Sequence, residues 1–119
     1  MAVNIVNVTS INGKTDAASI ASNDSASFAV NTSATDVFKV NTILISNQAD
    51  SAGDGGNALV NVIFRDNTTD YNFINDIEVP LKSTLDAIGS SIYVNQNQSI
   101  VVQSDSSALN VLVAYEDIS

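Results

Sequence analysis

Few residues in this chain have the chemistry needed for catalysis. Its 119 residues include no histidine and no cysteine, so the commonest general base, the commonest zinc ligand and any thiolate nucleophile are absent. Two glutamates, Glu78 and Glu116, invite an acid–base pairing. However, Glu78 falls on the polar side of a strand-like pattern and Glu116 lies close to the C-terminus, and neither has a histidine, cysteine or lysine partner nearby in sequence. We therefore interpret both as solvated carboxylates and expect a protein that is not an enzyme.

Two short motifs resemble ligand sites. Gly13-Lys14-Thr15 looks like the end of a phosphate-binding loop, but that motif needs a glycine five residues earlier, where Val8 stands, and a strand–loop–helix context. The loop at residues 50–57, with Asp50 and Asp54, offers oxygen ligands of the kind calcium takes, yet it lacks the spacing and the closing glutamate of an EF-hand. We interpret this loop as solvated, and calcium binding there stays an open question. No cofactor and no metal is predicted.

The charge balance bears on possible partners. Four lysine and arginine residues stand against thirteen aspartate and glutamate residues, giving a net charge of −9 at pH 7. Such a chain repels nucleic acid and anionic membranes, so we expect neither as a partner. No stretch approaches the roughly 18 apolar residues of a membrane helix, and the start lacks the basic and apolar regions of a signal peptide. We expect a soluble protein made in a cytoplasm.

The pattern of apolar residues predicts strands. Hydrophobic residues make up 45% of the chain, mostly β-branched or small, whereas the abundant asparagine, aspartate and serine disfavour helices. The strongest signal covers residues 37–64, which we read as two long strands joined by the loop 47–57, a central hairpin. About eight short strands are expected in total. We predict a single all-β domain over residues 1–119, an antiparallel β-sandwich of jelly-roll type.

The N-terminal third is less regular. We interpret residues 1–36 as an extended N-terminal arm with the first strands, and residues 37–119 as the core sandwich. A first strand is expected at residues 3–11, and Asn12-Gly13 is a turn signal. Between residues 14 and 36 the pattern allows a short strand at 25–31 or a single helical turn at 16–21.

Strands with apolar residues on both faces are candidates for an interface as well as a core. In the first predicted strand the parity of the apolar positions switches, which suggests a bulge or an arm that packs on different neighbours at its two ends. After Val37, Phe38 and Val40 define one face while two isoleucines make the other face apolar. The candidate interaction residues are Val3, Ile5, Val6, Val8, Ile43 and Ile45.

Two aromatic residues were considered as a ligand platform. Tyr71 and Phe73 could stack on a sugar ring or a base, but they alternate in phase with Ile77 and Val79. That phase favours packing in the core. Pro80 lacks a backbone donor and is expected to end this strand.

Three segments together carry a family resemblance. They are VFKVNTILISN, EVPLKSTLDAIGSSIYVNQNQSIVVQSD and LNVLVAYEDIS. This arrangement resembles small virion structural proteins of tailed bacteriophages, particularly those infecting cyanobacteria, in which a segment like VPxxSTL precedes an SPIYL-like strand and a segment like VxYEEIS closes the chain. The resemblance extends from residue 37 to the C-terminus. The matching positions are Val79-Pro80 with Ser83-Thr84-Leu85, Ser91-Ile92-Tyr93-Val94, and Tyr115-Glu116-Asp117-Ile118-Ser119.

The resemblance implies a non-enzymatic part of the virion. It favours a capsid decoration, or cement, protein on the capsid surface that binds the major capsid protein and itself, as a homotrimer at three-fold positions of the lattice. Many copies would bridge capsid subunits against the pressure of packaged DNA, with the arm at residues 2–36 as the capsid contact. Two alternatives stay open. One is a neck or tail protein of the virion. The other is a carbohydrate-binding β-sandwich module, against which the absence of tryptophan counts.

Overall fold

The computed structural model describes residues 10–49, 56–105 and 108–119. These residues form nine β-strands and no helix. The strands are β1 (Ile11–Ile20), β2 (Ser25–Asn31), β3 (Val37–Asn47), β4 (Ala58–Asp66), β5 (Thr69–Val79), β6 (Thr84–Asp86), β7 (Ile92–Val94), β8 (Gln98–Ser104) and β9 (Leu109–Ile118). No described segment is a helix long and apolar enough to cross a membrane.

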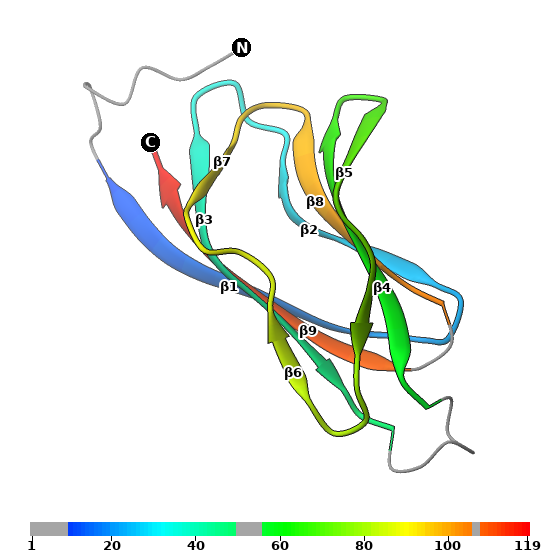
Figure 1. Ribbon diagram of the computed structural model, residues 1–119. Coiled ribbons are helices and arrows are strands. Elements are labelled where there is room, and N and C mark those ends of the chain that lie inside the picture. The colour runs from blue at the N-terminus through cyan, green and yellow to red at the C-terminus, as the bar shows by residue number, and fades with distance from the viewer. Residues whose placement is uncertain (1–9, 50–55, 106–107) are drawn as a thin grey trace.

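The strands form two antiparallel sheets packed face to face (Figure 1). Sheet A has the order β1-β9-β3-β6, with β7 also paired to β3, and sheet B has the order β2-β8-β4-β5. Because β6 and β7 pair with opposite ends of β3, they act as two parts of one interrupted edge strand. With that edge counted once, the order is that of an eight-stranded jelly roll. The predicted all-β antiparallel sandwich is therefore confirmed.

The core lies between the two sheets. Alternate residues of β3, β4, β8 and β9 point inward, because successive side chains of a strand face opposite sides of its sheet. Val40, Val60, Val102 and Val113 are fully buried there. The β4–β5 hairpin turns at residues 67–68, with Asn67 at a φ of 57°. β5 ends at Val79, immediately before Pro80, as expected.

The predicted central hairpin is wrong. β3 belongs to sheet A and β4 to sheet B, so the chain crosses between sheets after Asn47 instead of turning back within one sheet. A long loop permits either connection, and both β3 and β4 have their own antiparallel partners, β9 and β8.

The N-terminal third contributes more to the sandwich than its sequence pattern suggests. Gly13 does not form a turn but lies inside β1, which pairs with β9 along its whole length. The helical turn considered near residues 16–21 is also absent, because those positions continue β1 or follow it directly. Ile20 and Phe28 are nearly fully buried in the core. The predicted strand at residues 25–31 is confirmed as β2.

A β-bulge in β3 changes which residues share a face. The pairing with β9 shifts between Val40 and Thr42, leaving Asn41 as the extra residue. One extra residue reverses the in–out alternation beyond it. As a result Ile43 and Ile45 point into the same core as Val40, and both are 0% exposed.

Two buried asparagines join the sheets at the two ends of β3. Asn31, the last residue of β2, donates from Nδ2 to the carbonyls of Asp36 and Val94, both at 2.9 Å, and its Oδ1 accepts from the Ser33 amide at 2.9 Å. Asn31 lies in sheet B, whereas Val94 belongs to β7 in sheet A. Its side chain therefore connects the two layers at the end of the sandwich where β3 begins.

Asn47, the last residue of β3, repeats this arrangement. Its Nδ2 donates to the carbonyls of Gly56 and Val79, both at 2.9 Å, and its Oδ1 accepts from the Ala49 amide at 3.0 Å. In each of these two asparagines, Nδ2 donates two hydrogen bonds and Oδ1 accepts one. All polar atoms of the two buried amides are thus hydrogen-bonded, as burial requires.

Candidate interaction surfaces

The most apolar exposed feature of sheet B is its edge strand β5. Tyr71, Phe73 and Ile77 are 57%, 41% and 37% exposed. Tyr71 is paired with Phe64 and Ile77 with Val60, so both lie on the inner side of sheet B. The edge of sheet A that faces β5 consists of the three-residue strands β6 and β7. Because this edge is short, it leaves the side chains of Tyr71 and Ile77 accessible. We call Tyr71, Phe73 and Ile77 the β5 strip.

The exposure of the β5 strip corrects the expectation that Tyr71 and Phe73 pack in the core. The pairing of β4 with β5 shifts twice, once between Val60 and Val62 and again between Val62 and Ile63. Each shift adds one residue to β5 and breaks its alternation. The two extra residues together restore the original parity, so Tyr71, Ile77 and Val79 still pair with inward-facing residues of β4, and only Phe73, which has no paired residue there, leaves the phase of the sequence. Tyr71 is nevertheless exposed, because the short edge of sheet A does not cover it.

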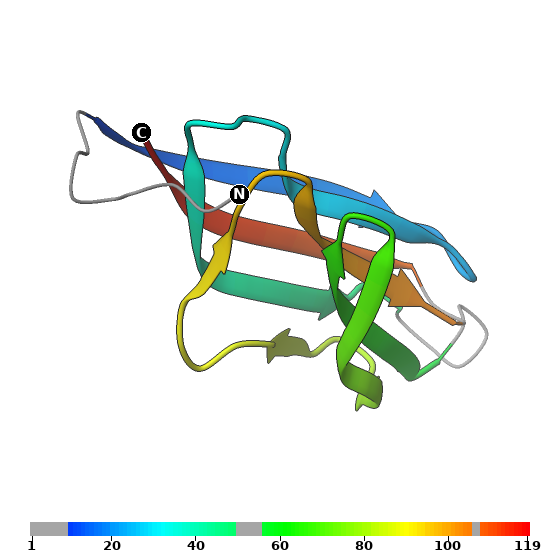
Figure 2. The same cartoon turned by 90° about the horizontal axis from the view of Figure 1, so that it is seen from above.

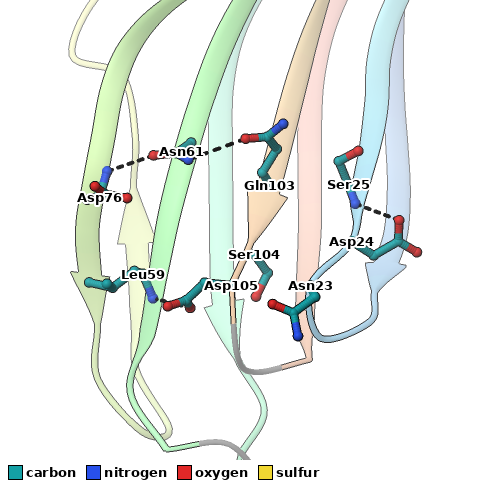
Figure 3. Close-up of a pocket in the computed structure, with 9 residues that line it drawn as sticks. All are labelled: Asn23, Asp24, Ser25, Leu59, Asn61, Asp76, Gln103, Ser104 and Asp105. Carbon is teal, nitrogen blue, oxygen red and sulfur yellow. Dashed lines mark hydrogen bonds between the residues drawn. The ribbon is translucent and has the colours of Figure 1, made fainter.

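Asn61 holds the bulge of β5 nearer its C-terminal end. Asp76 has a φ of 53°, an uncommon backbone conformation for a residue with a side chain. Its amide donates to Asn61 Oδ1 at 2.7 Å, while Asn61 Nδ2 donates to Gln103 Oε1 at 3.3 Å. The side chain of Asn61 thus links β5 through β4 to β8 (Figure 3).

A polar pocket of about 340 Å³ lies at this position, at the end of sheet B where β2 begins and β8 ends (Figure 3). Two of its carboxylates are fixed by backbone amides: Asp105 accepts from Leu59 and Asp24 accepts from Ser25, each at 2.8 Å. No lysine or arginine lines the pocket. The lining residues are Asn23, Asp24, Ser25, Leu59, Asn61, Asp76, Gln103, Ser104 and Asp105.

Three ion pairs are found among the described residues. Arg65 donates two hydrogen bonds to the Asp70 carboxylate, at 2.6 and 3.1 Å. This hydrogen bonding lowers the pKa of Asp70. Lys39 lies 4.0 Å from Glu116. Lys14 Nζ lies 3.0 Å from Asp117 Oδ2, and this hydrogen bond raises the pKa of the lysine.

The residues considered for chemistry do not come together. Gly13, Lys14 and Thr15 lie within a regular strand, and Lys14 is engaged by Asp117. Glu78 and Glu116 belong to different sheets and bond to Asn57 and Asn41. Within residues 10–49, 56–105 and 108–119, no group of three or more acidic, histidine or cysteine residues could hold a metal. Asp50 and Asp54, considered above as calcium ligands, lie outside the described residues.

The predicted interaction residues have two outcomes. Ile43 and Ile45 offer no surface to a partner, because the bulge at Asn41 directs them into the core. The other four, Val3, Ile5, Val6 and Val8, lie outside the described residues. The apolar–polar alternation of the sequence does not indicate that the β5 strip is exposed. The unusual density of asparagine and aspartate between its residues was the available sign of an irregular strand.

The fold and these surfaces define a jelly-roll β-sandwich with an exposed apolar edge strand. No protein-family model and no curated protein matches the chain. Among solved structures it is similar to a chain of the Bacillus endospore appendages, described as a novel family of disulfide-linked pili. The TM-score is 0.52 at 12% identity, and the match covers 99% of this chain and 94% of the other. At that identity the similarity shows the fold alone.

Proposed function

We propose that this protein is a non-enzymatic structural subunit of a tailed-bacteriophage virion, and specifically a capsid decoration protein that binds the lattice of the major capsid protein. The observation that carries the proposal is the β5 strip. Aromatic and large aliphatic side chains that stay exposed together are typical of protein interfaces. The sequence resemblance is the reason for proposing a virion protein, and the jelly roll is a fold found in viral capsid domains.

The structural neighbour supports an assembly role more generally. A chain of this fold is described as building pili, so the fold serves a repeating assembly in that protein. The present chain contains no cysteine, so it cannot form the disulfide links by which that neighbour is described, and we propose an assembly held by non-covalent contacts. A decoration protein acts in that way: many copies contact neighbouring capsid subunits, and the combined contacts resist the pressure of packaged DNA.

Capsid binding can be tested with two matched variants. Shells assembled from the major capsid protein of the source phage are incubated with the chain and sedimented, and the bound fraction is measured. The double variant Tyr71→Ser, Phe73→Ser is expected to lose binding, whereas Tyr93→Ser is expected to keep it. Tyr93 is a suitable control because it is 47% exposed and pairs with Lys39, whose neighbours Phe38 and Val40 face the core. Its side chain therefore lies on the outer face of sheet A. Full binding by the double variant, with its fold intact by circular dichroism, would refute the role of the β5 strip.

Position in the particle is tested by copy number. Quantitative mass spectrometry of purified virions gives the ratio of this chain to the major capsid protein. A ratio near the number of lattice positions supports decoration. The low ratio of a six- or twelve-fold ring would move the protein to the neck or tail, and absence from the particle would refute the virion role.

A carbohydrate-binding module is the second candidate, and the polar pocket of Figure 3 favours it. Fixed carboxylates and amides suit the hydroxyl groups of a neutral sugar, and the lack of a cation disfavours anionic ligands. Leu59, 40% exposed at the rim, would contact the apolar face of the ring. Titration calorimetry with host-surface polysaccharides tests this candidate: binding that is lost in Gln103→Ala would support it, and no heat from the unchanged protein would reject it.

A further inference from the structure

The β1 edge of sheet A differs from the other sheet edges. Its pairing with β9 runs without a register shift from Ile11 to Ile20. By contrast, β5 carries two shifts, β2 carries one, and β6 and β7 have three residues each. Bulges and short strands are the usual means by which proteins prevent other strands from pairing with a sheet edge. β1 has neither, and no described strand pairs with its outer side (Figure 2).

The hydrogen-bonding groups on that outer side follow from the ladder. Ser10 and Ser119 exchange both backbone hydrogen bonds, at 3.1 and 3.0 Å. In an antiparallel pair such hydrogen-bonded positions alternate with positions whose amide and carbonyl point away from the partner. Counting from Ser10, the even-numbered residues of β1 bond to β9. The odd-numbered residues offer their amides and carbonyls to the open edge, and they are Ile11, Gly13, Thr15, Ala17 and Ser19.

An apolar hollow adjoins the open edge. A depression of about 570 Å³ is lined by residues 17–19 of β1 and 110–112 of β9. Leu112 is 44% exposed and pairs directly with Ala17. Because Ala17 is small, a larger side chain on a strand added beside β1 can pass over it and contact Leu112. The edge thus provides both backbone hydrogen bonds and a side-chain pocket, which are the two elements of recognition by strand addition.

We propose that the β1 edge binds the N-terminal segment of a second copy of this chain, residues 2–9, as an additional strand. The inference rests on the proposed role as an assembly subunit and names its partner. The segment AVNIVNVT has no charged side chain, although the whole chain carries −9, so the segment itself adds no charge repulsion to the contact. It has apolar residues on both faces, as a strand with covered sides requires. Its length is close to that of β1.

The same segment is poorly suited to fold back on its own copy. It leads directly into Ser10 and β1, so it would have to reverse through a tight hairpin. Two-residue hairpin turns favour Asn-Gly, Asp-Gly or another glycine pair, and residues 2–9 contain no glycine. The β-branched Val8 and Thr9, which would occupy the turn, avoid the positive φ it needs. Exchange between copies avoids this turn.

Such a contact is heterologous, because the segment of one copy meets the β1 edge of the next. Heterologous contacts produce a closed ring when the rotation between copies closes, and a filament when it does not. The homotrimer predicted from the sequence resemblance is the smallest ring of this kind that fits the three-fold positions of a capsid lattice.

Because the chain lacks cysteine, disulfide trapping can test the contact cleanly. Two full-length variants, Val6→Cys and Ala17→Cys, are mixed under mild oxidation, and mass spectrometry reports which chains become linked. We expect the mixed Val6–Ala17 product in excess over either homodimer. Absence of the mixed product, or linkage only within one chain when both substitutions are placed together, would overturn the proposal.

A backbone test complements the trapping. Thr15→Pro removes an amide that faces the open edge without breaking the ladder to β9, since proline is tolerated where a strand amide faces solvent. It is expected to weaken self-association by at least about tenfold in sedimentation velocity, whereas Thr15→Val, which keeps the amide, should not. Equal association of the two variants would refute strand addition at β1. No capsid is present in either assay, so the result is independent of capsid binding.

Discussion

Removing the side chain of Asn31 should destabilise the protein far more than removing an exposed asparagine. The Asn31→Ala variant loses all three hydrogen bonds of the amide and leaves the Val94 and Asp36 carbonyls and the Ser33 amide without those partners. A buried polar group without a partner costs about 1–3 kcal/mol. Because water can reach some of these groups after truncation, we expect a loss of about 2–5 kcal/mol in the free energy of unfolding, from a total of about 5–15 kcal/mol for a domain of this size.

The assay is equilibrium unfolding in urea followed by circular dichroism, with the slope m held common to all variants. Asn110→Ala is the matched control, because Asn110 is exposed and accepts one hydrogen bond, from Ser19; we expect a change within about 0.5 kcal/mol. Asn31→Asp sharpens the test. Its shape is nearly the same, but an ionised carboxylate cannot donate and would place an oxygen 2.9 Å from two carbonyl oxygens.

If Asn31→Ala unfolded within about 0.5 kcal/mol of the unchanged protein, the idea that this amide joins the sheets would be refuted. Asn47→Ala should show the same loss, because its three hydrogen bonds repeat the pattern. The two residues lie at opposite ends of β3 and share no partner. Their losses should therefore add within about 0.5 kcal/mol.

Three further variants test other parts of the fold. Ile43→Ala should cost about 2–5 kcal/mol and Leu44→Ala less than about 1.5 kcal/mol by urea unfolding, because the bulge directs Ile43 into the core; equal losses would contradict the bulge. Asn61→Ala should cost about 1 kcal/mol and speed hydrogen exchange at the Asp76 amide. Burial raises the pKa of Tyr115 above 10.0. The stability that the neutral phenol contributes is therefore fully present below pH 10.0 and is lost as the pH rises through the higher pKa of the folded protein. In Tyr115→Phe the urea midpoint should fall less over this alkaline range.

Much of the fold follows from sequence because strands leave a local signal. The alternation in residues 58–64 and 109–115, the turn residues around Asn67 and the stop at Pro80 each depend on neighbouring residues only. These features locate the strands and favour a sandwich. They do not identify which strands pair, because the partner of a strand is chosen by contacts that are distant in sequence. The assignment of β3 and β4 to one hairpin failed for this reason.

The candidate surface was harder to predict, because a bulge changes which residues share a face of the sheet without changing the apolar–polar alternation of the sequence. Tyr71, Phe73, Ile77 and Val79 share one parity in the sequence, which indicates a common face for a regular strand. With two extra residues in β5, Tyr71, Ile77 and Val79 remain paired with inward-facing residues of β4, Ile74 joins them, and Phe73 has no paired residue. The single extra residue of β3, Asn41, instead reverses the alternation of all the residues that follow it. In each case a polar residue inside an apolar run was the only local sign, and polar residues at strand surfaces are too common to identify a bulge.

The two proposed contacts use opposite sides of the sandwich, and this placement leads to a last prediction. β1 and β5 are terminal strands of different sheets, and β5 stands over the edge of β6 and β7, at the far side of sheet A from β1 (Figure 2). One copy can therefore bind a neighbouring copy through β1 while the β5 strip contacts a capsid protein. Thr15→Pro should weaken self-association by at least about tenfold yet retain capsid binding, whereas Tyr71→Ser with Phe73→Ser should abolish capsid binding yet retain self-association. Sedimentation velocity and shell binding, measured on the same preparations, decide the point. If either variant lost both activities while staying folded, the two surfaces would not be independent. One shared interface would then have to serve both partners.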